Sequence, residues 1–472
     1  MTSIASRLFA EEPALLTSAN FGTHVGQGVG PGPSVIMGDQ SEIGLYPQIS
    51  QSRMDYRMAW QARSGDLVIV GHRDQAFETY FCALLGLKDV TFIEADPTLG
   101  LSVAKQALLA GSMQSRLDQL AINQEHVTLR SYLTTGHTWC LARHLARVCD
   151  AKIHVCGPTP RTARRVNDKL WFAALARDAL SQDATPPSKP AFGPAAAAGL
   201  VNYLAKRADT VVVKVPDSAG SVGNLAFNSA DLRDLGIAEI RNMLLDRLRA
   251  TGWMDRYPVL IGVWDADVIS SPSAQMWIPL PGDGVPRLQG IFEQHVRGVG
   301  GAFVGAARSD LPKPLQNKLA REAILIAEIF QNIGYFGQCS LDAVICRSGD
   351  EQPRIHWIEC NGRWGGVSIP LQLAGRLCSE GLPDGLLIVQ EVRHDVPQID
   401  TKSYLASLSG LLATPADPTE GIIVLSPPQA RLGSMLNWLV LASSQEAAVA
   451  LAQKAISRLQ SLSPLPDVVA NG

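Results

Sequence analysis

The feature that most constrains this fold is a series of short apolar segments that alternate with helical patterns. Residues 67–70 (Leu-Val-Ile-Val) and 90–93 (Val-Thr-Phe-Ile) are apolar, and residues 75–85 between them have a helical pattern. Residues 152–156 form a further apolar segment that ends in a Gly-Pro turn. Strands that are apolar throughout are buried on both faces, and helices between such strands are typical of parallel connections. The sequence therefore predicts an α/β unit with a mainly parallel sheet over residues 66–160.

Composition excludes several classes of protein. Of the 472 residues, 46% are hydrophobic and 18% are charged, which is enough apolar material for large buried cores. The 41 basic and 44 acidic side chains give a net charge of −3, so we expect no nucleic-acid partner and no membrane surface as partner. Eight cysteines are scattered without a CxxC pair, which argues against a disulfide framework or a zinc site.

The lack of a secretory signal pattern and of a long apolar segment predicts a cytoplasmic protein. Residues 1–16 contain Glu11 and Glu12 and lack the apolar core of a secretory signal. No segment approaches the roughly 18 consecutive apolar residues of a membrane-spanning helix, and the longest candidate, residues 435–442, is predicted to be a buried strand. The oligomeric state is open between a monomer and a homodimer.

Beyond residue 160, helical and strand patterns continue, and a proline-rich stretch over residues 183–198 predicts a loop or linker. Helices are expected over residues 162–180, 198–207, 314–333 and 445–459. Strands are expected over residues 210–215, 259–263, 275–279, 290–296, 302–305, 338–346, 354–360, 422–425 and 436–441. Residues 1–65 show no clear periodicity and are expected to be irregular. Their glycine-rich part, residues 24–33, is predicted to be either an irregular loop or a lid over a substrate, because Pro31 and Pro33 prevent helix entry.

The residues with the most informative chemistry lie on two segments that are predicted to be neighbouring strands. Glu359 and Asn361 are two apart and therefore project from one face of a strand, and Arg363 follows in a glycine-rich turn. Asp342 reaches the same place if the preceding strand pairs antiparallel with this one. Two carboxylates and an amide oxygen are hard ligands that suit Mg²⁺. The alternative is that Asp342 and Glu359 only pair with Arg354 or Arg363.

A second group of residues is suited to an anion. Lys214 ends a β-branched strand, where an unpaired ammonium is costly to bury, and a loop of small residues follows it at 217–224 (the small-residue loop). Gly220 and Gly223 allow the backbone N–H groups of this loop to approach phosphate oxygens. A solvent-facing lysine beside an ordinary hairpin is the alternative. Lys169, near the start of a helix, opposes the helix dipole unless an anion lies nearby.

The order of these elements resembles the ATP-grasp superfamily of carboxylate–amine ligases. The resemblance rests on Lys169, on Lys214 with its small-residue loop, on Asp342, and on residues 359–366 (Glu-Cys-Asn-Gly-Arg-Trp-Gly-Gly). It extends in architecture over residues 66–370. Within the superfamily the chain looks most like the pheganomycin-type peptide ligases. The resemblance implies an α/β fold, α+β in the lobes, in which a parallel-sheet pre-ATP-grasp domain precedes a two-lobed ATP-grasp fold.

The resemblance also implies a division of the chain and roles for single residues. The parts are an irregular N-terminal segment (1–65), the pre-ATP-grasp domain (66–160), a small lobe (161–260), a large lobe with the metal site (261–390) and a C-terminal strand–helix extension (391–472). The implied phosphate contacts are Lys169, Lys214, Ser218, Gly220, Ser221 and Gly223, and the implied magnesium ligands are Asp342, Glu359 and Asn361. Lys214 and Arg363 are the implied catalytic residues, and the hinge backbone at Val263 and Trp264 would contact adenine. The hinge departs from the family pattern, because Gly262 offers no side chain where a glutamate is common.

The implied activity is ATP-dependent formation of an amide or peptide bond with release of ADP. ATP and Mg²⁺ are the implied cofactors, and the substrates would be a small carboxylate and an amine or peptide. Attack of the carboxylate on ATP gives an acyl-phosphate, which has a good leaving group, and placed cations stabilise the charge that develops. Two alternatives remain open: a carboxylase or kinase that uses the same scaffold, and an inactive nucleotide-binding regulator.

Other residues have weaker claims to a role. The candidates for substrate contact are Arg308, His72 and Arg73. Asp265 or Asp267 could bind the ribose or be a solvated turn residue, and Trp357 and Trp364 could be core residues or a pocket wall. Strand alternation predicts that His356 points away from Glu359, because the two are three residues apart.

Overall fold

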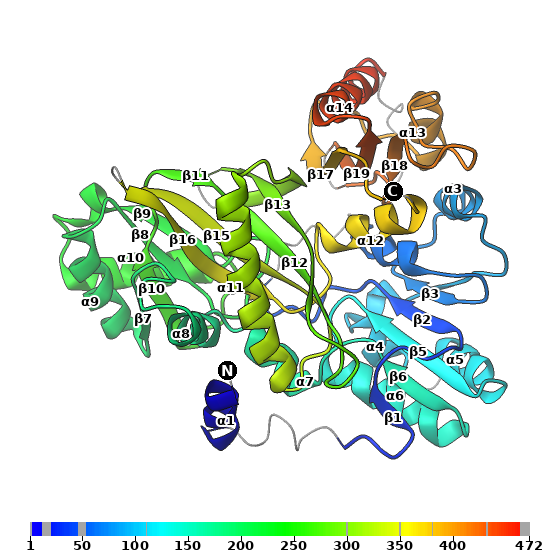
Figure 1. Ribbon diagram of the computed structural model, residues 1–472, viewed down its shortest axis with the longest axis horizontal. Coiled ribbons are helices and arrows are strands. Elements are labelled where there is room, and N and C mark those ends of the chain that lie inside the picture. The colour runs from blue at the N-terminus through cyan, green and yellow to red at the C-terminus, as the bar shows by residue number, and fades with distance from the viewer. Residues whose placement is uncertain are drawn as a thin grey trace, which may run out of the picture.

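The computed structural model describes residues 2–11, 20–45, 53–109, 111–298, 301–348, 351–379, 381–430 and 433–462. Figure 1 shows three neighbouring bodies: an N-terminal sheet on the right, a small lobe on the left and a long central sheet between them, which continues toward the C-terminal strands at the upper right. Among the described residues, no helix combines the length and the apolar character needed to cross a membrane. The fold is α/β in the N-terminal body and α+β in the two lobes, as the sequence predicted.

The N-terminal body is a six-stranded sheet in which every described pairing is parallel. In spatial order its strands are β1 (Val25–Gln27), β6 (Lys152–Val155), β5 (His126–Ser131), β2 (Ser34–Met37), β3 (Leu67–Val70) and β4 (Thr91–Glu94). All residues of β2 and β3 are buried, as expected for strands covered on both faces. The helices of this body are α3 (Gln75–Leu85), α4 (Val103–Gln106), α5 (Ser112–Ile122) and α6 (Gly136–Val148), with short 3₁₀ turns η1 (Met54–Gln61) and η2 (Pro97–Leu99). The predicted parallel sheet is confirmed.

The prediction that residues 1–65 are irregular is wrong for the part that the structure describes. This segment supplies β1, η1 and the central strand β2, together with the N-terminal helix α1 (Thr2–Glu11). Both strands are too short and too uniformly covered to show a period in the sequence. The glycines serve close packing: a Cβ on Gly32 would lie 1.8 Å from the carbonyl oxygen of His126, and one on Gly30 would lie 2.4 Å from the ring of His154.

The helix predicted over residues 162–180 is instead two helices, α7 (Pro160–Val166) and α8 (Lys169–Ala179). Asp168 separates them, because its carboxylate accepts hydrogen bonds from the backbone N–H groups of Leu170 and Trp171 at 2.8 and 3.2 Å and so caps α8. Because of this break, Lys169 is the first residue of α8. The proline-rich stretch at 183–198 likewise contains strand β7 (Ser188–Ala191) and the start of α9 (Pro194–Ala205), whose first residue is a proline.

The small lobe is a four-stranded antiparallel sheet with helices packed on it. Its strands, in spatial order, are β7, β10 (Val259–Val263), β8 (Thr210–Lys214) and β9 (Asn224–Asn228). Its helical elements are α9, η3 (Ser229–Leu232) and α10 (Ile237–Arg249). Leu260 of β10 pairs with Lys214, the last residue of β8. The small-residue loop connects β8 to β9.

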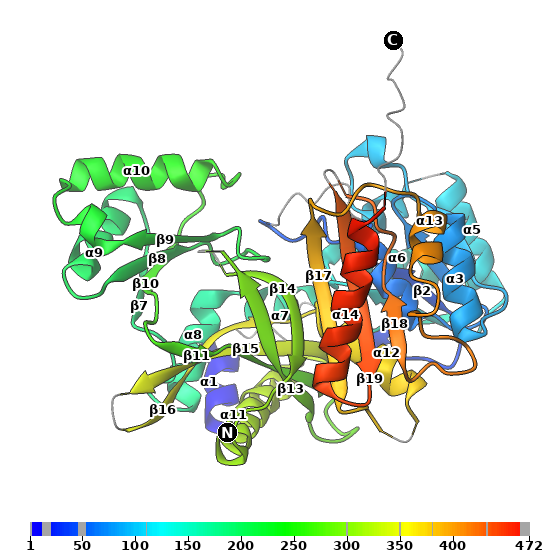
Figure 2. The same ribbon diagram turned by 90° about the horizontal axis from the view of Figure 1, so that it is seen from above.

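The large lobe is built on a sheet of nine described strands, all paired antiparallel. Its spatial order is β11 (Val268–Ser270), β15 (Gly337–Ser348), β12 (Pro272–Ile278), β13 (Arg287–Arg297), β14 (Ala302–Arg308), β17 (Gly385–Arg393), β19 (Ser434–Ala442) and β18 (Gly421–Val424), with β16 (Glu351–Asn361) paired to β15. Helix α11 (Lys313–Asn332) covers one face with a buried stripe that includes Leu319, Ala323 and Ile326. Figure 2 shows α1 beside α11, and Arg7 of α1 forms an ion pair with Asp178 of α8.

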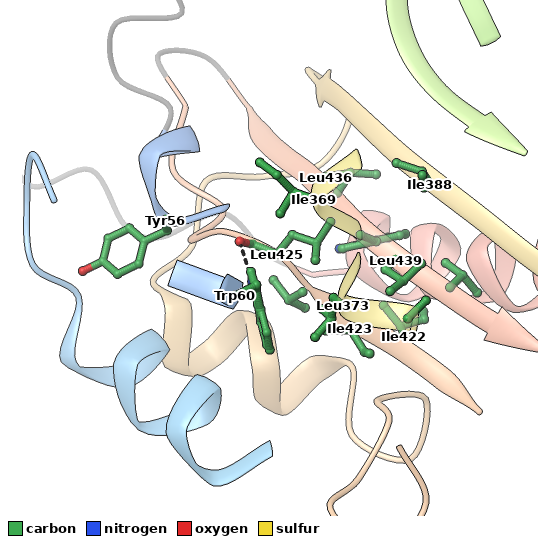
Figure 3. Close-up of a cluster of buried hydrophobic side chains, with 14 of the residues drawn as sticks. Tyr56, Trp60, Ile369, Leu373, Ile388, Ile422, Ile423, Leu425, Leu436 and Leu439 are labelled. Carbon is green, nitrogen blue, oxygen red and sulfur yellow. Dashed lines mark hydrogen bonds between the residues drawn. The ribbon is translucent and has the colours of Figure 1, made fainter. Parts of the chain in front are cut away.

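The C-terminal strands, in the region predicted as a strand–helix extension over residues 391–472, belong to the same sheet as the strands of the large lobe. Strands β17, β19 and β18 continue the large-lobe sheet, and the predicted boundary fell inside β17. The helices of this region are α12 (Ser368–Leu377), α13 (Thr401–Ser407) and α14 (Gln445–Gln460). They share one hydrophobic core with the N-terminal body. In Figure 3 the buried Trp60 donates a hydrogen bond from Nε1 to the carbonyl oxygen of Leu425 at 2.9 Å, so this core joins the two ends of the chain.

Candidate active site

The carboxylates predicted to share one place lie together on strands β15 and β16. Asp342 is paired with Glu359, and Ser340 is paired with Asn361. The side-chain amide of Asn361 donates hydrogen bonds to Asp342 at 2.8 Å and to Glu359 at 3.5 Å. Ser273 of β12 donates to the other carboxylate oxygen of Asp342 at 2.6 Å. We call Asp342, Glu359 and Asn361 the carboxylate corner.

A β-bulge within β16 changes which residues share this face, and it corrects the prediction for His356. Asp342 is opposite Glu359 and Ala343 is opposite Trp357, so Ile358 is an extra residue without a partner. One extra residue reverses the alternation beyond it. His356, opposite Val344, therefore lies on the same face as Glu359, where its Nδ1 is 2.9 Å from the carboxylate of Asp265.

Burial and neighbouring charges shift the pKa values of Asp342 and Glu359 in opposite directions. Burial and the charge of Glu359 raise the pKa of Asp342 to about 7. Burial alone would also raise the pKa of Glu359, but Lys169, followed by Lys214 and Arg363, lowers it overall. The corner thus offers one stable carboxylate and one carboxyl that a cation would ionise. These hard oxygen donors suit Mg²⁺, so the residues present fit the metal that the sequence predicted.

Lys169 bridges the carboxylate corner and the small-residue loop. Its ammonium lies 3.0 Å from the carboxylate of Glu359 and donates hydrogen bonds to the carbonyl and hydroxyl oxygens of Ser218 at 2.9 and 3.2 Å. Its side chain is 5% exposed, so this ion pair is shielded from solvent. A cation therefore already neutralises Glu359 in this structure, and an incoming metal ion or phosphate would have to redistribute these contacts.

The small-residue loop is shaped by residues that tolerate unusual backbone. Gly220 and Ser221 have φ angles of 62° and 63°, in the left-handed region. A Cβ on Gly223 would lie 2.4 Å from the hydroxyl oxygen of Ser218, so only glycine fits there. Ser221 donates a hydrogen bond at 2.9 Å to the carbonyl oxygen of Gly301, in the turn between β13 and β14. The loop of the small lobe therefore contacts the large lobe directly.

Among the described residues, Lys214 is a cation without a hydrogen-bonded or ion-paired partner. Within the described part of the chain its ammonium makes no hydrogen bond or ion pair, and its nearest ring is Trp264, with the ammonium 5.8 Å from the ring centroid. Burial lowers the pKa of Lys214, and Lys169 lowers it further, whereas Glu359 and Asp265 act in the opposite direction. A cation held in this way favours binding of an anion.

The predicted hinge lies beside a small cavity of about 20 Å³ between the lobes, lined by Lys214, Gly262, Val263 and Ile358 among others. The backbone N–H of Val263 donates to the carbonyl of Pro187, and that of Trp264 donates to the carbonyl of Thr210, both at 3.0 Å. Both hinge N–H groups are therefore engaged within the small lobe. An adenine at this hinge would have to use carbonyl oxygens and the apolar walls of the cavity.

Sequence reasoning missed the role of Asn167, between α7 and α8. Its side-chain oxygen accepts hydrogen bonds from Arg363 at 2.7 Å and from the backbone N–H of Gly362 at 3.0 Å. Its amide donates to the carbonyl oxygens of Ala163 and Gly362. Arg363 in turn donates to the side-chain oxygen of Asn361 at 2.6 Å. No local pattern could have revealed this contact, because Asn167 and Arg363 are 196 residues apart.

Sequence reasoning also missed a cavity of about 540 Å³ beside Arg363. Besides Arg363, five described segments form its wall: residues 42–45 and 133–136 of the N-terminal body, the α7–α8 region, the chain from Val215 to Ser218, and residues 252–258. The backbone N–H of Ala219 donates to the carbonyl of Leu45 at 2.8 Å, which fixes the small-residue loop against the N-terminal body. The signal that could have suggested this cavity is the position of segments 133–136 and 42–45 after β5 and β2, at the carboxyl edge of a parallel sheet.

The weaker candidates lie elsewhere. Arg308 donates to the carbonyl oxygen of Pro383 at 3.0 Å, at the edge of β14. His72 and Arg73 are exposed beyond β3, where His72 contacts Glu94 and Arg73 forms an ion pair with Glu78 at 2.6 Å. None of the three lines either of the two cavities described above. Trp357 and Trp364 are 1% and 3% exposed and belong to the hydrophobic cores, although Trp357 also borders the small cavity.

Comparison with known proteins identifies the fold. The family described as the pre ATP-grasp domain matches residues 55–146. The solved ADP complex of PurK, an N5-carboxyaminoimidazole ribonucleotide synthetase, is similar over 91% of this chain and 97% of that chain, with 12% identity and a TM-score of 0.55. A biotin carboxylase from Campylobacter jejuni, in a beta-gamma-ATP complex, has 14% identity and a TM-score of 0.55, over 90% of this chain and 91% of that chain.

A third similar structure is the biotin carboxylase domain dimer of 2-oxoglutarate carboxylase from Hydrogenobacter thermophilus, solved with MgADP, ADP and bicarbonate. It has 15% identity and a TM-score of 0.53, over 90% of this chain and 89% of that chain. No curated protein sequence matches the chain. At these identities the similarity establishes a shared fold, and the chain therefore has the ATP-grasp fold with a pre-ATP-grasp domain.

Proposed function

We propose that this chain is an ATP-dependent ligase that activates a carboxylate as an acyl-phosphate and couples it to an amine, forming an amide or peptide bond. The observation that carries the proposal is the grouping of two cations with the carboxylate corner, since Lys169 pairs with Glu359 and the charge of Lys214 also acts on this carboxylate. Such an arrangement suits a magnesium-bound triphosphate. The peptide-ligase variant of this activity, with a place in natural-product biosynthesis, is our preferred form of the proposal.

Each residue has a defined task in this mechanism. Mg²⁺ held by Asp342, Glu359 and Asn361 would neutralise phosphate oxygens. Lys214 and Lys169 would bind the triphosphate, and the backbone N–H groups of the small-residue loop, which bends at Gly220 and Ser221, would contact phosphate oxygens. The first step forms a bond between a carboxylate oxygen and the γ-phosphorus, with ADP as the leaving group.

The second step forms the carbon–nitrogen bond. The amine attacks the acyl carbon, the bond to the phosphate oxygen breaks, and the amine loses a proton. The oxyanion that forms in between would be stabilised by Arg363, which Asn167 and Asn361 hold by hydrogen bonds of 2.7 and 2.6 Å. The contact of Ser221 with Gly301 would help to exclude water from the reactive acyl-phosphate.

A carboxylase is the second candidate, because the similar structures named above are a synthetase of a carboxyamino product and two biotin carboxylases. The distinguishing measurement is release of ADP and phosphate with a panel of acids and amines, with and without bicarbonate. We expect release to require both an acid and an amine, and hydroxylamine to trap the activated acid as a hydroxamate. Bicarbonate-dependent turnover would favour the carboxylase. Phosphate transfer to a hydroxyl acceptor would favour a kinase, and tight ATP binding without turnover would favour a regulator.

A further inference from the structure

The 540 Å³ cavity beside Arg363 carries a further inference about the acceptor substrate. Arg363 and Ser218 both line it, so a molecule in this cavity contacts the residues assigned to the acyl-phosphate and the triphosphate. Its volume lies within the usual range for small-molecule sites. A molecule bound there would therefore be in place to react at the activated carboxyl group.

The cavity wall carries charges that no other part of the described structure neutralises. Arg164 and Arg256 both line it, and neither makes a hydrogen bond or ion pair through its guanidinium within the described residues. Asp217, at the start of the small-residue loop, lines the same cavity and is also unpartnered among those residues. Within the part of the chain that the structure describes, the cavity therefore presents two cations and one anion that lack a partner.

The other acidic groups on the wall are already engaged. Glu42 accepts hydrogen bonds from Thr135 and contacts Nδ1 of His137, so both of its oxygens have partners. Asp168 caps helix α8 through its Oδ1 atom. Asp217 is consequently the acidic side chain best placed to meet a positive group on a ligand.

Part of the wall is apolar and rigid. Trp253 is 5% exposed, its Nε1 donates to the carbonyl of Arg256 at 3.0 Å, and its ring meets that of Tyr257 edge-on with 5.2 Å between centroids. Leu45 and Leu133 line the cavity from the N-terminal body. This wall suits an apolar group, since the polar atom of Trp253 is satisfied and its ring is packed against that of Tyr257.

We propose that this cavity binds the acceptor as a free α-amino acid, or a short peptide with a free carboxyl terminus, that has an apolar side chain. Arg164 and Arg256 bind its carboxylate, Asp217 binds its ammonium group, and Trp253 and Tyr257 pack against its side chain. This inference rests on the proposed ligase function and specifies its acceptor. Asp217 lies one residue before Ser218, a contact of Lys169, so the ammonium group would be held next to the site of acyl transfer.

Calorimetric titration of the full chain with L-phenylalanine, in the presence of Mg²⁺ and a non-hydrolysable ATP analogue, tests the proposal. L-Phenylalaninamide, which lacks the carboxylate, and 3-phenylpropionate, which lacks the amine, are the matched probes. We expect both to bind at least about tenfold more weakly than the amino acid, since each loses a charge-assisted contact. Arg164→Gln and Arg256→Gln should each weaken amino-acid binding about tenfold, with the affinity for the ATP analogue unchanged.

Arg116→Gln, on the exposed surface of α5, is the control and should leave both affinities unchanged. Asp217→Asn should weaken binding of L-phenylalanine but not of 3-phenylpropionate, a split that general damage to the cavity would not produce. Equal affinity for the amino acid and its amide, or no binding of L-phenylalanine at all, would overturn the proposal.

Turnover separates this inference from the proposed function. If the amino acid binds with the expected dependence on Arg164 and Arg256 but no acid leads to ADP release, the ligase function fails and the cavity assignment stands. If amide formation occurs but is equally fast with amines that lack a carboxylate, the ligase function stands and the acceptor assignment fails.

Discussion

The carboxylate corner and the 540 Å³ cavity lie on either side of Arg363, but they treat charge in opposite ways. In the corner, Glu359 is bound by Lys169, and Asp342 is bound by Ser273 and Asn361. On the cavity wall, Arg164, Arg256 and Asp217 have no partner within the described residues. A buried charge must be compensated within the protein, whereas a charge on a cavity wall can be solvated until a ligand binds it. Substitutions in the corner should therefore affect the protein and its chemistry together, and substitutions of Arg164, Arg256 or Asp217 should affect binding alone.

The largest effect should come from Glu359→Gln, which keeps the shape of the side chain and removes its charge. We expect turnover to fall on the order of 10²- to 10³-fold, because a proposed metal ligand and the partner of Lys169 are lost together. Steady-state ADP release measures the loss, with thermal unfolding as a check of folding. Glu328→Gln, on α11, is the control. Near wild-type turnover in a folded Glu359→Gln protein would rule out the magnesium assignment.

The next-largest effect should come from Lys214→Met, which removes a buried ammonium from a site that lowers its pKa. We expect the affinity for ATP to fall roughly 10- to 100-fold, the usual value of a lost charge-assisted hydrogen bond. Stability should be unchanged or slightly higher, because an incompletely compensated cation is removed. Nucleotide titration measures the expected loss of ATP affinity, and thermal unfolding measures the expected unchanged or higher stability. An unchanged ATP affinity would contradict the phosphate role.

A smaller effect is expected from Asn167→Ala, which frees Arg363 and Gly362 without touching any group proposed to contact ATP. We expect kcat to fall roughly tenfold with little change in the KM for ATP, as is common for residues that orient a reactive side chain. Asn167→Asp retains the accepting oxygen and should restore part of kcat. Asn202→Ala, on α9, is the control. A change in KM alone would show that Asn167 acts on binding rather than on Arg363.

The smallest effect concerns pH. Because the pKa of Asp342 is raised to about 7 by burial and Glu359, protons compete with a metal ion for this carboxylate. Affinity for Mg²⁺ should rise about fourfold from pH 6.5 to 8, the change in the ionised fraction of a group with this pKa. For the metal-free protein the sign is opposite: the folded state holds the proton more tightly, so this group's contribution to stability falls as pH rises toward 7. Asp342→Asn should abolish both dependences.

The sequence predicted the elements whose patterns are long and local. Strands β3, β4 and β6 of the parallel sheet, helix α11 with its apolar stripe, and strands β15 and β16 were expected within a few residues of their bounds, whereas strands β1, β2 and β5 were not predicted. The same holds for the gathering of Asp342, Glu359 and Asn361, because it depends only on alternation along one strand and on pairing with its neighbour. Short-range chemistry of this kind is visible in a single sequence.

What could not be predicted depends on contacts between distant segments. Strand β2 has only four residues and is central only because β3 and β5 flank it. Asn167 matters because α7 ends against Gly362, and the cavity exists because residues 42–45 meet residues 252–258. The N–H groups of Val263 and Trp264 are engaged by Pro187 and Thr210, which no local pattern indicates. Each of these features is a property of tertiary packing.

The bulge at Ile358 has a consequence for how this protein can change. In β16, Trp357 points into a core and Glu359 lies on the opposite face with Asp342, although the two are separated by only one residue. Deleting Ile358 would make Trp357 and Glu359 direct neighbours, which regular alternation places on opposite faces, so both side chains would keep their present sides. Deleting Cys360 would instead make Glu359 and Asn361 direct neighbours and turn one of them away from Asp342. Strand β16 therefore tolerates a change of length at the bulge but not within the regular pairing that holds the proposed ligands together.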